Sequence, residues 1–138
     1  MDRKQPAHRS GQLVAVCTLA AGADGRCRWC GEALPARRRT WCSDRCADAF
    51  WKNHWWTLAR RAAKRRDRYR CTRCGHKPPS RSHPKYKRLR KTDRLEVNHI
   101  ERARGTHRAL SCLHHLANLE TLCLGCHREI TAASRTLH

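Results

Sequence analysis

Aromatic residues, acidic residues and long apolar runs are all scarce in this chain of 138 residues. Aromatic side chains make up 6% of the sequence and apolar types 39%, so a conventional packed core is hard to build. No apolar stretch approaches the roughly 20 residues that cross a bilayer, which excludes an integral membrane protein. The 11 acidic residues are scattered singly, which excludes the carboxylate clusters that many nucleases use to hold two metal ions.

Basic residues dominate the charge that is present. The chain carries 31 Lys and Arg, so its formal net charge is +20 when the histidines are neutral. A small protein with this charge repels itself unless it works beside a polyanion, and nucleic acid is the expected partner. An anionic membrane surface would instead require a basic amphipathic helix with an exposed apolar face, whereas the charge here is spread along the whole chain.

Ten cysteines supply another way of holding a small fold together. Eight of them form two sets with the spacing of four-cysteine zinc sites. The first set is Cys27, Cys30, Cys42 and Cys46, and in the second the pair Cys71 and Cys74 is answered by Cys123 and Cys126. The sequence therefore predicts two structural Zn²⁺ ions.

Disulfide bonds in a secreted protein are the competing interpretation of these cysteines. Export would require a signal peptide, and the one candidate is the short, weakly apolar run over 13–23. Two complete zinc sets need a reducing compartment, so we expect a cytoplasmic protein. Cys17 and Cys112 belong to neither set and are interpreted as small buried apolar residues. In an alternative interpretation, Cys112 braces a loop together with His114 or His115.

The pattern along the chain predicts three parts. Residues 1–24 are expected to form a loose arm with one short strand from Leu13. Residues 25–66 form a zinc-knuckle module followed by a helix that Ser43 caps, and residues 67–138 form a second zinc-braced module. The expected helix has an apolar stripe, which favours packing of its tryptophans in a core over base stacking: Ala47, Trp51, Trp55, Leu58 and Ala62.

Two basic segments are candidates for nucleic-acid contact. The first lies on the polar faces of the expected helix and comprises Arg60, Arg61, Lys64 and Arg65. The second lies in a loop over 77–94 that suits tracking of phosphates and comprises Lys85, Lys87, Arg88, Arg90 and Lys91.

Short strands over 95–100 and 118–123 and a helix over 124–134 are expected after this loop, so the predicted fold class is a small, zinc-stapled α+β protein. Several histidines are interpreted as surface or loop residues, namely His54, His76, His83, His114 and His115.

Three segments of the second module resemble the HNH endonucleases of the ββα-metal type that a four-cysteine zinc braces. They are Cys71-x2-Cys74, the run Glu96-Val97-Asn98-His99-Ile100, and the run from Asn118 to His127. The resemblance covers about half the chain, from Arg70 to Thr131. The first knuckle with its helix is similar to a zinc unit found ahead of some bacterial and phage HNH domains. This resemblance implies a ββα-metal fold over 67–138 that hydrolyses DNA phosphodiester bonds.

The resemblance also implies roles for the matching residues. His99 would activate the attacking water, and Asn98 and His127 would hold one Mg²⁺ or Mn²⁺. Asn118 would brace the loop and help to fix His99. Many family members have Asp or His where this chain has Asn98, which is a neutral ligand.

Other interpretations stay open at this point. The chain could be a non-catalytic, zinc-stapled DNA- or RNA-binding module in which the histidines are incidental. Glu96 could orient a catalytic water, although a solvent-facing strand residue is the favoured interpretation. The sequence leaves both a monomer and a homodimer open.

Overall fold

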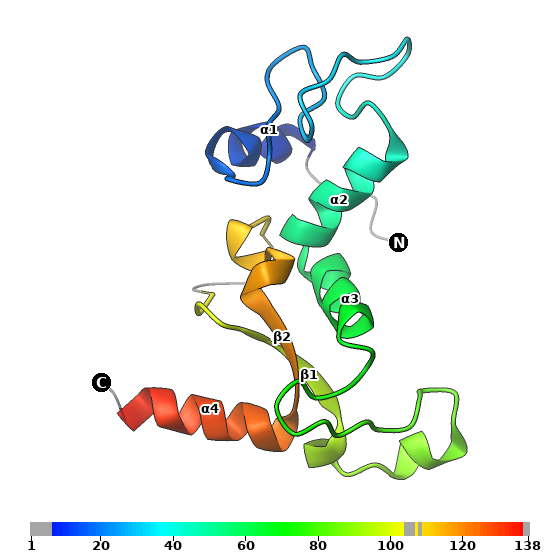
Figure 1. Ribbon diagram of the computed structural model, residues 1–138, viewed down its shortest axis with the longest axis vertical. Helices are drawn as coiled ribbons and strands as arrows, with labels where there is room; N and C mark the ends of the chain where they lie inside the picture. The colour runs from blue at the N-terminus through cyan, green and yellow to red at the C-terminus, as the bar shows by residue number, and fades with distance from the viewer. Residues whose placement is uncertain (1–6, 104–106, 108, 137–138) are drawn as a thin grey trace. The chain divides into compact units, whose positions relative to one another are not determined.

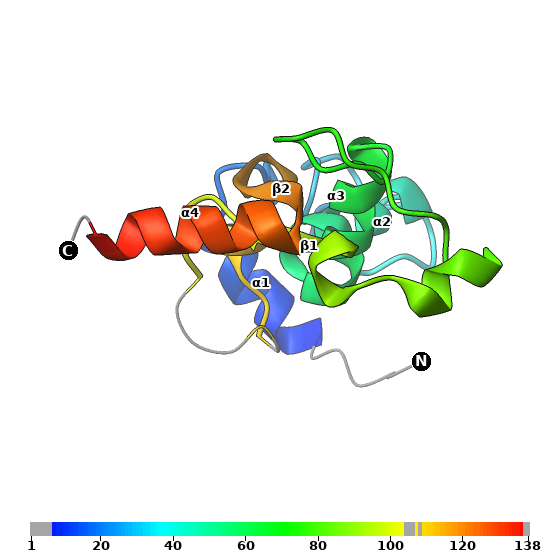
Figure 2. The ribbon, with the colours of Figure 1, turned by 90° about the horizontal axis from the view of Figure 1, so that it is seen from below.

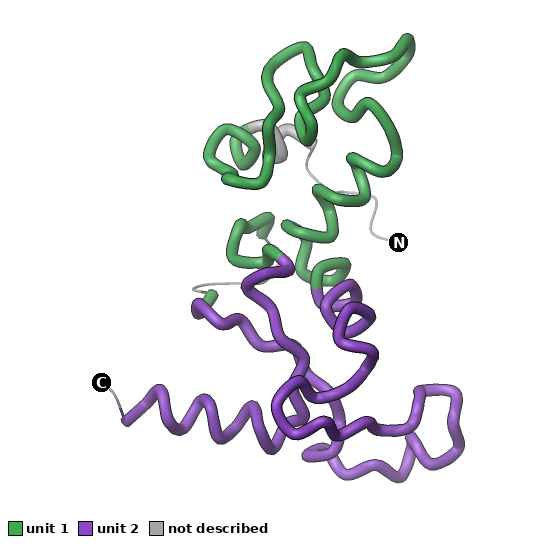
Figure 3. The backbone as a smooth tube through the Cα atoms, in the orientation of Figure 1, with its two compact units in different colours: residues 1–59, 103–115 green, residues 60–102, 116–138 purple. Residues whose placement is uncertain are grey.

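The computed structural model describes residues 7–103, 107 and 109–136 (Figure 1). The chain divides into two compact units, and Figure 3 distinguishes them by colour. Unit 1 contains residues 1–59 and 103–115, and unit 2 contains residues 60–102 and 116–138. No helix within these described ranges is long and apolar enough to cross a membrane.

Unit 1 begins with a helix where a strand was predicted. Helix α1 spans Ala7–Val16, so the expected strand from Leu13 is wrong. The N–H of Cys17 donates to the carbonyl of Leu13 at 2.9 Å, which extends the helical turn, and both Val14 and Cys17 are buried. A spacing of three residues between buried side chains suits a helix, whereas a strand would alternate them. Residues 1–6 of the expected arm lie outside the described residues.

The predicted cap at Ser43 is confirmed, but the helix after it is shorter than expected. Helix α2 spans Asp44–His54, and the Ser43 side chain accepts a hydrogen bond from the N–H of Cys46. Trp55 then takes an extended conformation (φ −104°, ψ 118°), and α3 spans Trp56–Arg66. The break shifts the buried face away from the predicted stripe, whose members are only partly buried, and the fully covered residues are Phe50, His54, Ala59 and Ala63.

Unit 2 is built around a two-stranded antiparallel sheet. Strand β1 spans Leu95–His99, β2 spans Leu119–Cys123, and α4 spans Leu124–Thr136, starting where β2 ends (Figures 1 and 2). These are the predicted strands and helix, so the small α+β class is confirmed. The register pairs Asn98 with Glu120 and His99 with Leu119. Successive side chains on a strand point to opposite faces, so Glu96, Asn98 and Glu120 share one face of the sheet and His99 belongs to the other.

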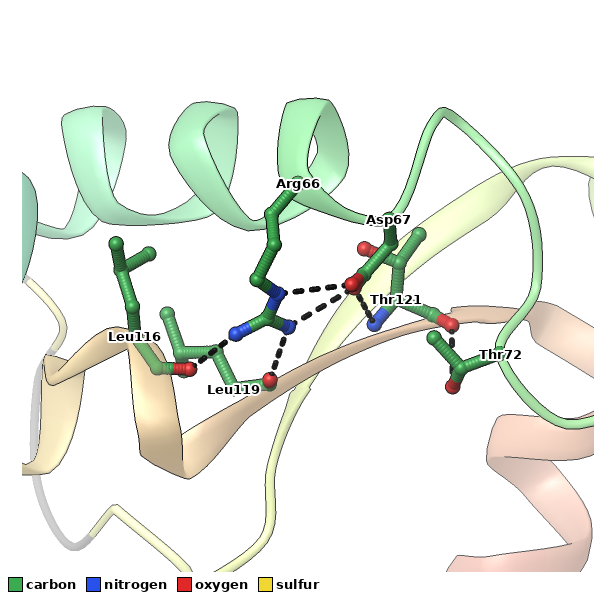
Figure 4. A network of polar contacts seen from close by, with 6 residues as sticks. All are labelled: Arg66, Asp67, Thr72, Leu116, Leu119 and Thr121. Atoms are coloured by element: carbon green, nitrogen blue, oxygen red, sulfur yellow. Dashed lines mark hydrogen bonds and ion pairs between the residues drawn. The ribbon is translucent and has the colours of Figure 1, made fainter.

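Side chains and the Thr72 main chain bond to the outer edge of β2, and among the described residues no third strand pairs with it (Figure 4). Arg66, at the end of α3, donates to the carbonyl oxygens of Leu116 and Leu119, each at 2.6 Å. Asp67 accepts from the buried N–H of Thr121 at 3.1 Å, and Thr72 donates to the Thr121 carbonyl at 2.9 Å. The main-chain groups that an edge strand would leave unpaired are thereby satisfied.

Asp67 is the centre of this network, because it directly follows α3 and its carboxylate accepts from the main chain of β2. Its carboxylate also pairs with the Arg66 guanidinium at 2.8 Å. Burial alone would raise the pKa of Asp67, but hydrogen bonds from Arg66 and Thr121 outweigh it and hold that pKa below its usual range. The charged form of Asp67 therefore belongs to the folded state.

Removing the Asp67 carboxylate is expected to destabilise unit 2. The Asp67→Ala variant leaves the Thr121 N–H buried without an acceptor, which costs about 1–3 kcal/mol of unfolding free energy. Asp67→Asn keeps an acceptor and should lose less. Denaturant unfolding of zinc-loaded protein, followed by circular dichroism, measures both, and equal losses would contradict this role for the Thr121 bond.

Candidate functional site

The first four-cysteine set forms a zinc-knuckle turn in unit 1. The Gly31 N–H donates to the Cys27 carbonyl and the Cys27 N–H donates to the Glu32 carbonyl, each at 2.9 Å. Gly31 has φ +79°, a left-handed conformation that glycine adopts without strain. Cys46 lies in the first turn of α2, with its sulfur 3.6 Å from that of Cys42.

The second set repeats this turn in unit 2. The Gly75 N–H donates to the Cys71 carbonyl and the Cys71 N–H donates to the His76 carbonyl, each at 2.9 Å, and Gly75 has φ +76°. Cys123 ends β2 and lies 3.8 Å, sulfur to sulfur, from Cys74. The N–H of Cys126 points at the Cys123 sulfur at 3.4 Å, as is favourable for a thiolate.

Both sets fit a tetrahedral zinc ion. Bonds of about 2.3 Å from zinc to sulfur give sulfur–sulfur edges of about 3.8 Å. The observed separations of 3.5 to 3.8 Å lie near this edge, and in each set all four ligand atoms lie within 4.8 Å of one another. Each set could therefore hold a zinc ion.

One cysteine in each set has a thiol pKa below its usual range. Burial would raise the pKa of Cys71, but N–H groups from Cys74, Cys123 and Arg73 lower it to about 6. Cys27 has an equivalent environment, in which the N–H groups of the knuckle outweigh burial and lower its pKa to about 6. The opposite holds for Cys46, where burial raises the pKa to about 12. Metal binding must therefore displace protons from some of these thiols.

A third cluster brings together two cysteines and two histidines that belong to neither four-cysteine set. Cys17, His54, Cys112 and His115 bring their ligand atoms within 4.8 Å of one another. His54 and His114 are 0% and 1% exposed, so their interpretation as surface or loop residues is wrong. Burial lowers the pKa of His54 to about 4 and that of His115 in the same direction, so both imidazoles are neutral at pH 7. Within this cluster the Cys112 sulfur lies within 4.8 Å of a ring nitrogen of His115, one of the two partners considered for Cys112.

The expected catalytic residues lie at the ends of the two strands. His99 is the last residue of β1 and is 9% exposed. Asn118 immediately precedes β2, and its side chain makes two hydrogen bonds to the main chain of Glu101, accepting at 2.7 Å and donating at 3.1 Å. Its carbonyl also accepts from the Ile100 N–H at 2.9 Å. Asn118 thus fixes the backbone that directly follows His99.

The two expected ligands of the catalytic ion are each held by a carboxylate. The Asn98 amide nitrogen donates to Glu120 at 2.9 Å, and His127 Nδ1 lies 2.8 Å from a Glu96 oxygen. Glu96 is exposed on β1, as the favoured interpretation expected, and its carboxylate also contacts His127. The sequence interpretation missed the carboxylate partner of each ligand, because Glu96 and Glu120 are 24 positions apart and only the strand register brings them to one face.

The expected nucleic-acid contacts are exposed, with one exception. Arg60, Arg61 and Arg65 of α3 are exposed, whereas Lys64 is partly buried and its pKa is lowered by burial and by Arg60. The loop residues Lys85, Lys87, Arg88, Arg90 and Lys91 are all exposed. A shallow hollow beside Glu96 and His127 adds two basic residues that were not predicted, Arg128 and Arg135. The sequence signal that could have identified Arg128 and Arg135 was their position on the same helix as His127, one and eight residues after it.

Comparison with models of known protein families, with curated proteins and with solved structures found no match.

Loss of the second zinc set is expected to unfold unit 2. Its apolar core is small and centres on Leu122 with Cys71 and Cys123, so metal binding must supply much of its stability. The Cys123→Ser variant should contain about one zinc ion fewer per chain than the parent and should melt at a lower temperature. Cys42→Ser, which removes one sulfur from the first set, is the matched variant in unit 1. Metal analysis with thermal unfolding measures both, and unchanged zinc content in Cys123→Ser would contradict the assignment.

Proposed function

We propose that this protein is a metal-dependent HNH endonuclease that hydrolyses DNA phosphodiester bonds, with its ββα-metal site in unit 2. The observation that carries the proposal is the pair of carboxylate-held side chains, one of which, Asn98, directly precedes His99 on β1. Glu120 holds Asn98 and Glu96 holds His127, all four on one face of the hairpin or on the helix that follows it. A module that only bound DNA would have no need for such a pair at this position.

The hydrogen bonds leave the correct atoms available for a metal ion. A carboxylate can only accept, so Glu96 fixes the proton of a neutral His127 on Nδ1 and leaves the Nε2 lone pair for a ligand. The amide nitrogen of Asn98 donates a hydrogen bond to Glu120, so the amide oxygen of Asn98 is the atom that can ligate a metal ion. An imidazole nitrogen and an amide oxygen suit Mg²⁺ or Mn²⁺, and the two carboxylates behind them balance charge.

We assign the general base to His99. A neutral imidazole there would take a proton from the water that attacks phosphorus. Asn118 holds the main chain after His99 through Glu101 and Ile100, which keeps the ring in a fixed direction. A divalent cation held by Asn98 and His127 would stabilise the negative charge that develops on the leaving 3′ oxygen.

We place the substrate along the edge of β1 that does not pair with β2. Side chains of Asn98 and His99 point to opposite faces of β1, and among the described strands β1 pairs with β2 alone. A phosphodiester lying along the outer edge of β1 would be within reach of both faces. Arg128 and Arg135 line the hollow next to Glu96 and His127 and offer contacts to the flanking phosphates. Zinc–thiolate sets persist in reducing conditions, so we propose that this activity belongs in the cytoplasm.

Replacing the base should abolish cleavage and spare binding. His99→Ala is expected to lower the Mg²⁺-dependent nicking rate of supercoiled plasmid by about two to four orders of magnitude, because proton transfer in the transition state is lost. DNA affinity, measured by fluorescence anisotropy, should stay close to that of the parent. A His99→Ala protein that cuts as fast as the parent would overturn the catalytic assignment.

A variant with the opposite behaviour serves as the control. Neutralising Arg88, Arg90 and Lys91 together should weaken DNA binding and flatten its salt dependence, because fewer counterions are released. If the parent protein binds DNA with a steep salt dependence but never nicks it with Mg²⁺ or Mn²⁺, it is instead a zinc-stapled DNA-binding module.

The metal requirement should respond to residue 98. Asn98→Asp adds a negative charge about 2 Å from the ion and beside Glu120, so we expect the Mg²⁺ concentration for half-maximal nicking to fall several-fold. The maximal rate need not rise, because a carboxylate ligand makes the ion less electrophilic. Mg²⁺ titrations at constant ionic strength compare it with the parent and with Asn98→Ala, which should need more Mg²⁺. Three superimposable curves would show that residue 98 is not a ligand.

A further inference from the structure

Cys17, His54, Cys112 and His115 come from three separate segments of unit 1. Cys17 follows α1, His54 ends α2, and the other two belong to residues 103–115, which the chain inserts between β1 and β2. The Cys17 sulfur lies 3.2 Å from His54 Nε2 and 3.4 Å from His115 Nε2, and the two Nε2 atoms are 3.1 Å apart.

These separations match the edges of a tetrahedral metal site. With bonds of about 2.3 Å to sulfur and about 2.05 Å to nitrogen, a zinc ion gives sulfur–nitrogen edges of about 3.5 Å and nitrogen–nitrogen edges of about 3.3 Å. The observed values lie slightly inside those edges. Two thiols and two imidazoles are also a common ligand set of structural zinc.

The orientation of His54 has a cause in the helix that carries it. Its Nδ1 lies 2.7 Å from the Phe50 carbonyl oxygen one turn earlier in α2. Because a carbonyl can only accept, Nδ1 carries the proton and the lone pair of Nε2 points toward Cys17 and His115. A ligating histidine in proteins typically makes such a bond with its other nitrogen.

The cluster occupies the place of a core. His54 is 0% exposed and Cys17 is 6% exposed. The only phenylalanine of the chain, Phe50, stacks on the His54 ring with centroids 4.4 Å apart, and Trp29 from the first knuckle meets the same ring edge-on at 6.2 Å. Aromatic rings thus cover His54, while Cys112 and His115 are half-buried.

We propose that these four residues bind a third zinc ion, which anchors Cys112 and His115 to Cys17, after α1, and to His54, at the end of α2, within unit 1. Four protein ligands complete a tetrahedron and leave no position for water or substrate, so the site is structural. It belongs to unit 1, whereas the proposed catalytic residues belong to unit 2, and it does not depend on the nuclease function. The Ser111 N–H, which donates to the His54 carbonyl at 3.2 Å, would be held in place by the same ion.

Metal content tests the proposal directly. The purified, reduced full-length protein should contain about three zinc ions per chain, matching its three ligand clusters. A metal-free cluster joined by hydrogen bonds, or a disulfide between Cys17 and Cys112, would leave about two. Elemental analysis per protein, with intact mass under native and denaturing conditions, separates the three arrangements, and a parent protein with about two zinc ions would overturn the proposal.

Paired substitutions at one ligand localise the ion. His115→Ala should contain about one zinc ion fewer than the parent, whereas His115→Cys supplies another ligand and should retain the parent content. His83→Ala, at an exposed histidine in unit 2, is the control and should lose none. Equal zinc content in the parent and His115→Ala would contradict the assignment.

Cobalt substitution keeps the test decisive if a variant misfolds. In the parent protein, Co²⁺ at a site with two thiolates and two imidazoles absorbs at higher energy, with weaker charge-transfer bands, than Co²⁺ at a four-thiolate site. A stepwise Co²⁺ titration of metal-free parent protein should therefore resolve two classes of site in a ratio of about two to one. A single four-thiolate class would exclude the third site.

Discussion

Clusters of thiols and imidazoles stand in this chain where apolar side chains are too few to form a broad core. All ten cysteines lie in three such clusters. In unit 2 Leu122 packs with Cys71 and Cys123, and in unit 1 Phe50 stacks on His54. A protein with a net charge of +20 also repels itself, so a few strong, local bonds suit it better than a broad, weakly packed interior.

The hairpin of unit 2 links this bracing to the proposed chemistry. Cys123 ends β2 and Cys126 lies in the first turn of α4, so a metal ion bound by the second set would fix the direction in which the His127 side chain leaves the helix. On the other edge, Arg66 and Asp67 satisfy the outer main-chain groups of β2. On the face of the sheet that carries Asn98, each proposed metal ligand keeps a carboxylate partner, Glu120 for Asn98 and Glu96 for His127.

Signals that act over a few residues predicted the helices and strands well, whereas contacts between residues far apart in the sequence could not be predicted. Ser43, the cysteine spacings and the alternation in 95–99 each act within a few residues, and the structure contains the cap, both zinc sets and the strand. The break at Trp55 carries no local signal such as proline or glycine, and the residue before it, His54, has its contacts with Cys17 and His115, 37 and 61 positions away. Glu96 and Glu120 likewise acquire their roles from the register of two strands that a long excursion separates.

The interleaving of the two units governs the order in which their metal sites can form during synthesis. The set from Cys27 to Cys46 is complete within 20 residues and can close first. Cys17 and His54 must wait for His115, and Cys71 and Cys74 must wait for Cys126. During that interval the growing chain carries two half-sites, each with two ligands, and a zinc ion that joins them produces a mispaired chain. If all three clusters bind zinc, the nascent chain would need its zinc delivered late, or would need the first ions to exchange quickly.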